Sequence, residues 1–237
     1  MKYPILGRER WRPIALSAVG TVLVLAFACV LFTLTVLAIQ PGLLPDTLAA
    51  FWEDKLLIPL NIFPVCVVLI VCYCLTGNAF SAAGIGGLIV NLLSYINLIK
   101  TDCRNDPFVP ADCALLREAA NAVGDYQLNL HWGTLAAILL LSAVCFALAY
   151  WSRARRPRWY VRGIMALVVL AVFGASMVKV YPSEDIYDRR GVGTVKVSKS
   201  NVPEVFRLCG FPYCFCTITT CIRSKNRTDI KKRRSRR

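Results

Sequence analysis

The stretch LLIPLNIFPVCVVLIVCYCLTGNAFSAAGIGGLIVNLLSYINLI (residues 56–99) contains 44 residues and no charged side chain. A helix needs about 20 apolar residues to cross about 30 Å of hydrocarbon, so one straight helix of this length would greatly overshoot a bilayer. The segment LTGNAF (75–80) supplies a Gly and an Asn, which favour a break in the chain. The stretch therefore predicts two membrane-spanning helices, at about 56–75 and 78–99, joined by a very short turn.

Three further apolar runs along the chain have the length of a membrane span. They predict transmembrane helices at about 14–39, 132–151 and 160–179. The first run is much longer than the apolar core of a signal peptide, and a cleaved signal is the alternative interpretation. Trp132 and Trp151 bound the fourth helix, and aromatic side chains favour the two membrane interfaces.

The composition of the chain agrees with a membrane protein. Its 237 residues are 57% hydrophobic and 18% charged, and the mean hydropathy is +0.54. A soluble domain has about 45–50% apolar and about 25% charged residues. The same composition excludes intrinsic disorder for most of the chain. We therefore predict an all-α integral membrane protein with five transmembrane helices.

The net charge of +14 would suit a nucleic-acid-binding protein, but its distribution argues against one. Residues 222–237 hold nine Lys or Arg and one Asp, so more than half of the positive excess lies there. A basic tail that follows five membrane spans and lies outside the cell has no nucleic acid to bind. We therefore expect no nucleic-acid partner.

The loops between the predicted spans differ in charge. The N-terminal segment has four Lys or Arg and one Glu, and residues 152–162 have five Arg and no acid. By contrast, residues 40–55 have one base against three acids, and residues 100–131 have three bases against five acids. Short basic loops stay in the cytoplasm. The pattern predicts a multi-pass plasma-membrane protein with its N-terminus inside and its C-terminus outside.

The loop between the third and fourth spans carries the most informative charges. Residues 111–123 predict a short extracellular helix at the membrane surface. Arg104, Asp106 and Asp112 lie beside it, and two interpretations of them stay open. They form a solvated loop with internal ion pairs, or Arg104 binds an anionic phospholipid headgroup and Asp106 orients it, with Asp112 as a further candidate for the headgroup site.

The span at 78–99 has a polar side as well as an apolar one. Asn91, Ser94, Tyr95 and Asn97 follow the small residues SAAGIGG, which allow close helix approach in lipid. These polar side chains predict hydrogen bonds between helices. The alternative hypothesis is a polar groove for a lipid headgroup, formed by Asn91, Tyr95 and Asn97.

The sequence offers no catalytic site. It contains no nucleophile elbow, no zinc-protease motif and no Gly-rich phosphate loop, and its single histidine, His131, is expected to be structural. Cys103 and Cys113 are a candidate disulfide pair in the third loop. The later cysteines follow C-x4-C-x-C-x4-C, which is not zinc-finger spacing. We predict no catalytic residue, no metal ligand and no cofactor.

Two blocks of the sequence resemble a known family. The run INLIKTDCRNDPFVPADCALLREA (96–119), followed by GDYQL (124–128), is similar to the outer loop of lipoteichoic acid synthase-like proteins. These are polyglycerol-phosphate synthases of Gram-positive bacteria. The stretches YPSEDIYD (181–188) and NVPEVFRLCGFPYCF (201–215) resemble the segment after their fifth span. The resemblance covers about residues 55–215 and includes an aromatic G-F-x-Y-x-F element.

The resemblance implies a role in cell-wall biogenesis. Enzymes of this family carry an extracellular sulfatase-like domain with a Thr nucleophile and a Mn or Mg ion. None of that domain is present here, so no nucleophile or metal ligand carries over. The resemblance implies a non-enzymatic membrane-anchoring module that binds a phospholipid, with phosphatidylglycerol as the expected lipid. The alternative is a standalone small membrane protein, such as a transporter or flippase subunit.

The chain is expected to divide into three parts. Residues 1–180 form the transmembrane domain, residues 181–215 an extracellular linker, and residues 216–237 a basic tail. The tail turns abruptly rich in Cys and Thr, which favours a truncated gene with an out-of-frame or disordered end. A genuine short paralogue with a wall-binding tail is the alternative. Composition does not determine the oligomeric state.

Overall fold

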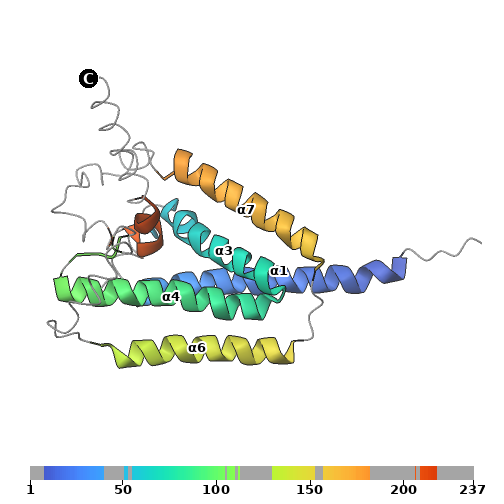
Figure 1. Cartoon of the computed structure of the whole chain (residues 1–237), viewed down its shortest axis with the longest axis horizontal. Helices are drawn as coiled ribbons and strands as arrows, with labels where there is room; N and C mark the ends of the chain where they lie inside the picture. The colour runs from blue at the N-terminus through green and yellow to red at the C-terminus, as the bar shows by residue number, and fades with distance from the viewer. Residues whose placement is uncertain are drawn as a thin grey trace, which may run out of the picture.

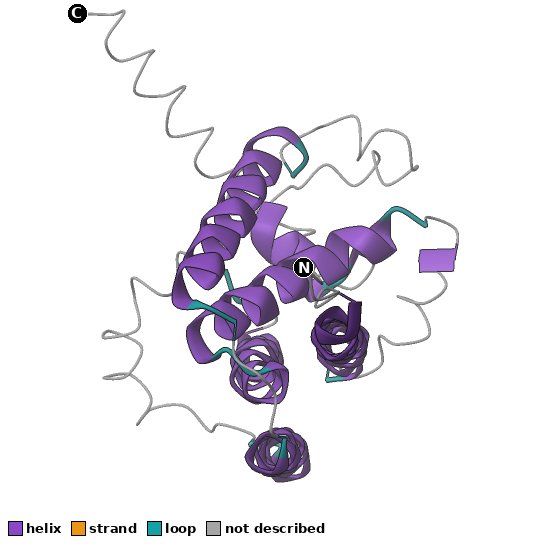
Figure 2. Ribbon diagram, turned by 90° about the vertical axis from the view of Figure 1, so that its right-hand side faces the viewer, coloured by secondary structure: helices purple, strands orange, loops and turns teal. Residues whose placement is uncertain are grey.

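Five long helices make up most of the described part of the chain (Figures 1 and 2). The computed structural model describes residues 8–39, 51–52, 55–104, 106–109, 112, 130–152, 157–181, 206 and 209–217. The long helices are α1 (Arg8–Ala38), α3 (Leu57–Thr76), α4 (Ala79–Arg104), α6 (Trp132–Trp151) and α7 (Trp159–Lys179). The described residues contain no β-strand.

Each of these helices is long and apolar enough to cross a membrane, α1 over its part Ala18–Ala38. The prediction of five helical candidate spans is therefore confirmed, and α6 has the predicted bounds. Helices α1 and α4 are longer than predicted, by six residues at the start and five at the end. The prediction stopped at the first charged residue, whereas helical backbone hydrogen bonds continue where the helix meets water.

The predicted break between the second and third spans is present. Gly77 follows α3 with φ +71°, a left-handed conformation that glycine adopts without steric cost, and its N–H donates to the Tyr73 carbonyl at 2.7 Å. The Asn78 side-chain oxygen then accepts the Phe80 N–H at 2.9 Å and caps the start of α4. The Asn78 amide also donates to Ser152 Oγ at 2.9 Å, which ties this turn to the end of α6.

Helix α4 is the centre of the bundle. It packs against α1, α3 and α6, and more than half of its apolar stretch is buried. Helix α7 packs mainly on α3 and has no buried residue. The apolar side chains that α6 and α7 leave exposed suit contact with lipid chains.

Glycines of α4 allow this central packing. A Cβ atom on Gly87 would overlap the buried ring of Phe32 on α1, and one on Gly86 would lie 2.8 Å from Leu69 Cδ2 on α3. Gly84 lies in the same way against an aromatic ring of α6. One short stretch therefore provides the close approach to three neighbouring helices. This is the packing role that the sequence predicts for the small residues.

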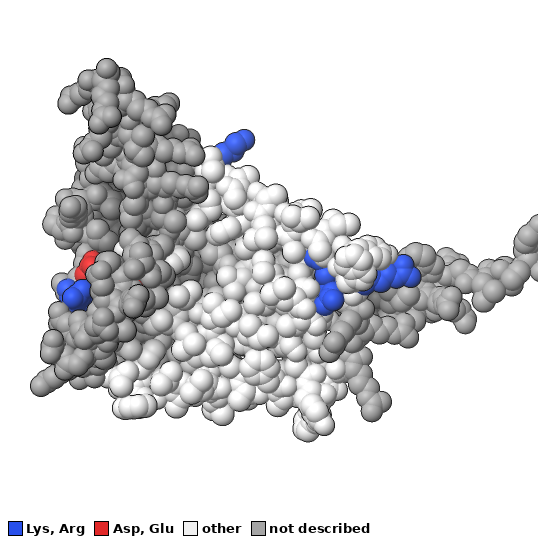
Figure 3. All heavy atoms as spheres, viewed as in Figure 1, with Lys and Arg blue, Asp and Glu red and all other residues white. Residues whose placement is uncertain are grey.

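The two ends of the bundle differ in their helix termini. At one end, here the Lys100 end, α1, α4 and α7 finish and α3 and α6 begin (Figure 1). The opposite end, here the Asn78 end, holds the turn between α3 and α4. On the face drawn in Figure 3, the described charged side chains lie toward these ends, with an uncharged surface between them. Such an uncharged surface is what a bilayer requires.

The glycine packing predicts that Gly87→Ala destabilises the bundle. The added methyl group meets the Phe32 ring, and overpacking of this kind typically lowers the free energy of unfolding by about 1–3 kcal/mol. Thermal unfolding of the detergent-purified protein measures the change. Gly174→Ala on α7 is the matched control, because a Cβ atom there meets nothing within 4 Å. Adding Phe32→Leu should restore part of the loss, and equal stability of the two alanine variants would contradict the packing.

Candidate functional site at the Lys100 end

Lys100 organises the polar side of its end of the bundle. Its ammonium group lies 2.7 Å from Asp112 Oδ2 and 3.1 Å from Asp106 Oδ2, and donates to the Pro107 carbonyl at 3.0 Å. The side chain is only 16% exposed. Asp112 Oδ2 also accepts the Val109 N–H at 2.8 Å. Because an ammonium group has three donors, this arrangement uses all of them. The chain after α4 is thereby held against the last turns of the helix.

A second contact fixes the same part of the chain from inside. The Asn97 side-chain oxygen, on a residue 2% exposed, accepts the Phe108 N–H at 2.7 Å. Phe108 is buried and its ring stacks on Phe215 at a centroid distance of 6.1 Å. Residues 106–109 therefore connect the end of α4 to a segment more than 100 positions later in the chain.

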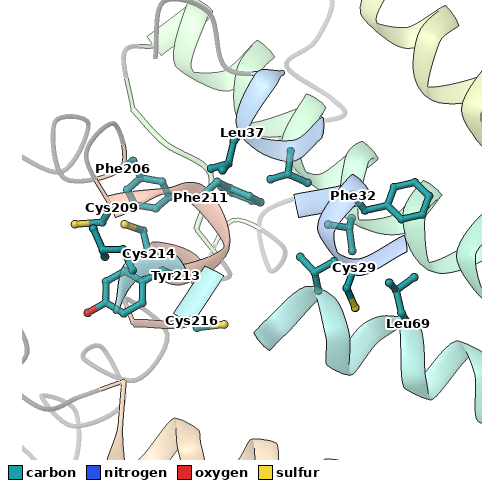
Figure 4. Packing of buried hydrophobic residues seen from close by; sticks show 14 of the residues in the cluster. Cys29, Phe32, Leu37, Leu69, Phe206, Cys209, Phe211, Tyr213, Cys214 and Cys216 are labelled. Atoms are coloured by element: carbon teal, nitrogen blue, oxygen red, sulfur yellow. The ribbon is translucent and has the colours of Figure 1, made fainter. Parts of the chain in front are cut away.

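That later segment, Phe206 with residues 209–217, is here named the docking segment. Residues 211–217 are helical, and the segment packs on the Lys100 end next to the start of α3 (Figures 1 and 4). The helical turn runs through positions 216 and 217. The helix therefore continues across the predicted boundary at position 216 between the linker and the basic tail.

Asn61 on α3 holds the docking segment through polar contacts. Its amide donates to the Cys209 carbonyl at 2.8 Å and to the Leu57 carbonyl at 2.9 Å. Its side-chain oxygen accepts the Tyr213 N–H at 3.2 Å. Asn61 is fully buried, so each of these bonds replaces one to water. The side chain uses both its donors and one acceptor position, which explains an asparagine within an apolar helix.

The close contact with Asn61 also requires a glycine in the docking segment. Gly210 has φ +87°, which favours glycine, and a Cβ atom there would lie 2.5 Å from Asn61 Oδ1. These two constraints explain why the first residue of the G-F-x-Y-x-F element is a glycine. It lets the backbone turn over the asparagine and lie directly against it.

Aromatic side chains cover the remaining part of this contact. Tyr181, which follows α7, is 1% exposed, donates from its hydroxyl to the Leu60 carbonyl at 3.1 Å and packs on Tyr213 at 5.8 Å. Phe211 packs against Phe215 at a centroid distance of 5.5 Å. The docking segment thus joins α3, the chain after α4 and the chain after α7 in one buried cluster.

Burial changes the acidity of groups in this cluster. Desolvation raises the pKa of the Cys216 thiol to about 12 and raises the pKa of the Tyr181 hydroxyl above its ordinary value. Desolvation also raises the pKa of the Cys214 thiol, with a further contribution from Cys209. These thiols are therefore protonated and poorly nucleophilic while the segment is docked.

The predicted polar residues of α4 lie inside the bundle. Asn91 is 1% exposed, and its side-chain oxygen accepts a hydrogen bond from Thr35 Oγ1 of α1 at 2.9 Å. Ser94 Oγ donates to the Val36 carbonyl of α1 at 3.1 Å. Tyr95 is 5% exposed and lies near α6, and its hydroxyl has no hydrogen-bond partner among the described residues. The hydrogen bonds of Asn91 and Ser94 thus join α4 to α1. Such bonds between helices are what the first of the two interpretations expects.

The three predicted headgroup-binding residues, Arg104, Asp106 and Asp112, lie at the Lys100 end of the bundle and not inside it. The structure brings Asp106 and Asp112 together on Lys100, while Arg104 is exposed in the last turn of α4. Beside them, His131 Nε2 lies 2.7 Å from Asp102 Oδ2 and links the ends of α4 and α6.

The candidate disulfide pair is only partly described. Cys103 is exposed near the end of α4. Cys113 and the predicted surface helix at 111–123 lie outside the described residues, apart from Asp112. The pairing of Cys103 with Cys113 therefore stays a prediction.

Sequence reasoning missed Lys100, Asn61 and Gly210. Lys100 had a detectable signal, because it is the first charge after 44 uncharged residues and three aspartates follow within 12 positions. Asn61 is a lone amide near the start of the same uncharged stretch. Its partners lie about 150 residues later, and no local pattern indicates such a contact.

Loss of the Asn61 hydrogen bonds should release the docking segment. Asn61→Leu removes its hydrogen bonds to the Cys209 carbonyl and the Tyr213 N–H, and each such bond typically contributes about 0.5–1.5 kcal/mol to stability. Cys216 then regains an ordinary pKa and should react with a maleimide at pH 8 roughly tenfold faster or more.

Peptide mass mapping of the labelled protein measures this rate at Cys216. Gly210→Ala should act in the same direction, because its methyl group meets the Asn61 side chain. Asn91→Leu is the matched control, since it removes an asparagine that bonds to α1 instead. Unchanged Cys216 labelling in Asn61→Leu would show that other contacts hold the segment.

The described residues contain no group of three or more His, Cys, Asp or Glu side chains that could hold a metal ion. No protein-family model, no curated protein and no solved structure matches the chain.

Proposed function

We propose that this chain is the membrane module of a lipoteichoic acid synthase-like phosphoglycerol transferase. Its role is to anchor to the plasma membrane and to bind an anionic phospholipid, with phosphatidylglycerol as the expected lipid. The observation that carries the proposal is the docking segment, which Asn61 holds against the Lys100 end. In the resembled family the corresponding aromatic element leads toward the extracellular catalytic domain. Docking of this segment would therefore fix the position at which such a domain begins.

The orientation in this proposal has the Asn78 end in the cytoplasm and the Lys100 end outside. Charge supports it, since the basic segments 1–12 and 152–162 adjoin, in the sequence, helix ends that lie at the Asn78 end. The acid-rich residues 100–131 connect, in the sequence, helix ends that lie at the Lys100 end. The proposed localisation is therefore a plasma membrane of the kind that Gram-positive bacteria have, with the docking segment on its outer side.

The lipid in this proposal binds at Arg104. An anionic headgroup is repelled by nearby carboxylates, and Lys100 offsets that repulsion because its ammonium pairs with Asp106 and Asp112. Arg104 is exposed in the last turn of α4, at the end of a candidate membrane span, where a lipid phosphate would be within its reach. A guanidinium binds phosphate through a bidentate fork that a lysine does not reproduce.

The alternative function is a standalone transporter or flippase subunit. One observation favours it: the Asn91 amide and the Tyr95 hydroxyl are buried within a span and have no hydrogen-bond partner there. Unpaired polar groups of this kind occur along transport pathways. Lipid transfer between leaflets of vesicles that contain the purified chain, abolished by Asn91→Leu, would favour this function over the anchoring module.

The proposed orientation predicts which thiols an impermeant reagent reaches. Cys103 is exposed near the Lys100 end, so a membrane-impermeant maleimide should label it in intact cells after an impermeant reductant has opened any bond to Cys113. Arg158→Cys places a matched thiol at the exposed start of α7, at the Asn78 end, and should be labelled only after permeabilisation. The reverse pattern would overturn the orientation and the proposed function with it.

The proposed lipid site predicts a specific effect of Arg104. Arg104→Ala should weaken binding of phosphatidylglycerol by roughly 1.5–3 kcal/mol, the scale of a hydrogen bond to a charged group, and Arg104→Lys should recover only part of it. Native mass spectrometry of the purified chain measures the binding. Arg158→Ala removes an exposed arginine at the other end and serves as control. Equal binding by all variants would leave Arg104 as a solvated residue at the end of α4, with no role in lipid binding.

A further inference from the structure

The docking segment holds a cysteine pair that the anchoring role does not use. Cys209 and Cys214 are 4% and 1% exposed, belong to one apolar cluster and are present as thiols. Their side chains lie beside each other in Figure 4, and the two thiols interact. Cys216, two positions further along, points away from this pair in the same view.

We propose that Cys209 and Cys214 form a disulfide bond that locks the docking segment in its docked conformation. This inference rests on the proposed function, because the outer side of a plasma membrane is where disulfides persist. The bond would connect the residue whose carbonyl Asn61 binds to the turn that follows Gly210. It would fix both sides of the left-handed glycine at the point where the segment meets α3.

The reaction requires an oxidant that carries a disulfide, either a small-molecule disulfide or a thiol oxidoreductase. The thiolate of one cysteine attacks a sulfur of the oxidant and expels one oxidant thiol, which leaves a mixed disulfide. The second cysteine then attacks that mixed disulfide and expels the other oxidant thiol. Two electrons and two protons leave the protein in total, and the disulfide of the oxidant becomes two thiols.

Docking controls both the rate and the equilibrium of this reaction. Burial raises the pKa of the Cys214 thiol, so exchange begins from the undocked segment, in which the thiolate is accessible. Docking then brings the two sulfurs together and favours ring closure. The completed bond is buried in the aromatic cluster, which protects it from reducing agents.

The chain contains a matched pair for comparison. Cys29 of α1 and Cys66 of α3 also interact through their thiols, but they lie within membrane spans. A hydrocarbon interior disfavours the thiolate and keeps a polar oxidant out. The inference therefore predicts oxidation of Cys209 with Cys214 and none of Cys29 with Cys66.

The experiment is a redox titration of the whole purified chain. The protein is reduced, equilibrated in glutathione buffers of increasing oxidising strength, quenched with acid and alkylated. Chymotrypsin cleaves after aromatic residues, and Tyr213 and Phe215 lie between the three cysteines of the docking segment. Mass spectrometry of the fragments then identifies which cysteines are joined.

The expected result is a bond between Cys209 and Cys214, unchanged in Cys216→Ser and lost in Cys209→Ser. In Asn61→Leu the equilibrium constant for closure should fall roughly tenfold, because the docking that gathers the sulfurs is weakened. Separate alkylated thiols at the most oxidising ratio would overturn the inference. So would a bond to Cys216, equal oxidation of Cys29 with Cys66, or an unchanged equilibrium in Asn61→Leu.

A second sample separates this inference from the proposed function. Cells that produce the chain are quenched directly with acid, and the same peptides are analysed. A bond that forms in buffer but is missing in cells would contradict the outward orientation and leave the cysteine pair intact. Failure in buffer would overturn the pair alone, because buffer reaches both ends of the detergent-solubilised bundle.

Discussion

The absence of water in a bilayer is the constraint on which this structure depends. Every backbone polar group inside the hydrocarbon must bond within the chain, which restricts the described spans to helices. The same constraint applies to polar side chains, and it explains the roles of four asparagines. Asn61 holds the docking segment, Asn78 joins the α3–α4 turn to α6, Asn91 bonds to α1, and Asn97 holds the chain after α4. The first three thus connect parts of the chain that lie more than 50 positions apart, whereas Asn97 bonds 11 positions further along.

Close packing complements these polar contacts. Apolar side chains gain little by leaving lipid for protein, so helices associate in membranes through tight contact and hydrogen bonds. The glycines at 84, 86 and 87 supply that contact on α4, and the surrounding helices take positions around it. Helix α7 makes few such contacts and faces outward, where lipid would cover it. The bundle therefore has one tightly packed centre and two outer helices.

The Lys100 end turns this bundle into a platform for the chain that follows the last span. Lys100 pairs with Asp106 and Asp112 and so holds the chain after α4 against the helix. The docking segment packs beside this chain, in the aromatic cluster. An exposed arginine lies next to these contacts. The proposed anchoring role uses the platform, the proposed lipid site uses the arginine, and the proposed disulfide would make the platform permanent. All three proposals concern the same end of the molecule.

The sequence by itself determined the helical class, the five candidate spans and the break at Gly77, because hydrophobic length and turn chemistry are local properties. It also identified the small residues that pack α4. Only the tertiary structure decided that Asp106 and Asp112 bind Lys100, and that Asn61 binds a segment about 150 residues later. The physical reason is that a hydrogen bond depends on the positions of two groups in space. Periodicity along the chain indicates local structure and does not indicate which distant groups come into contact.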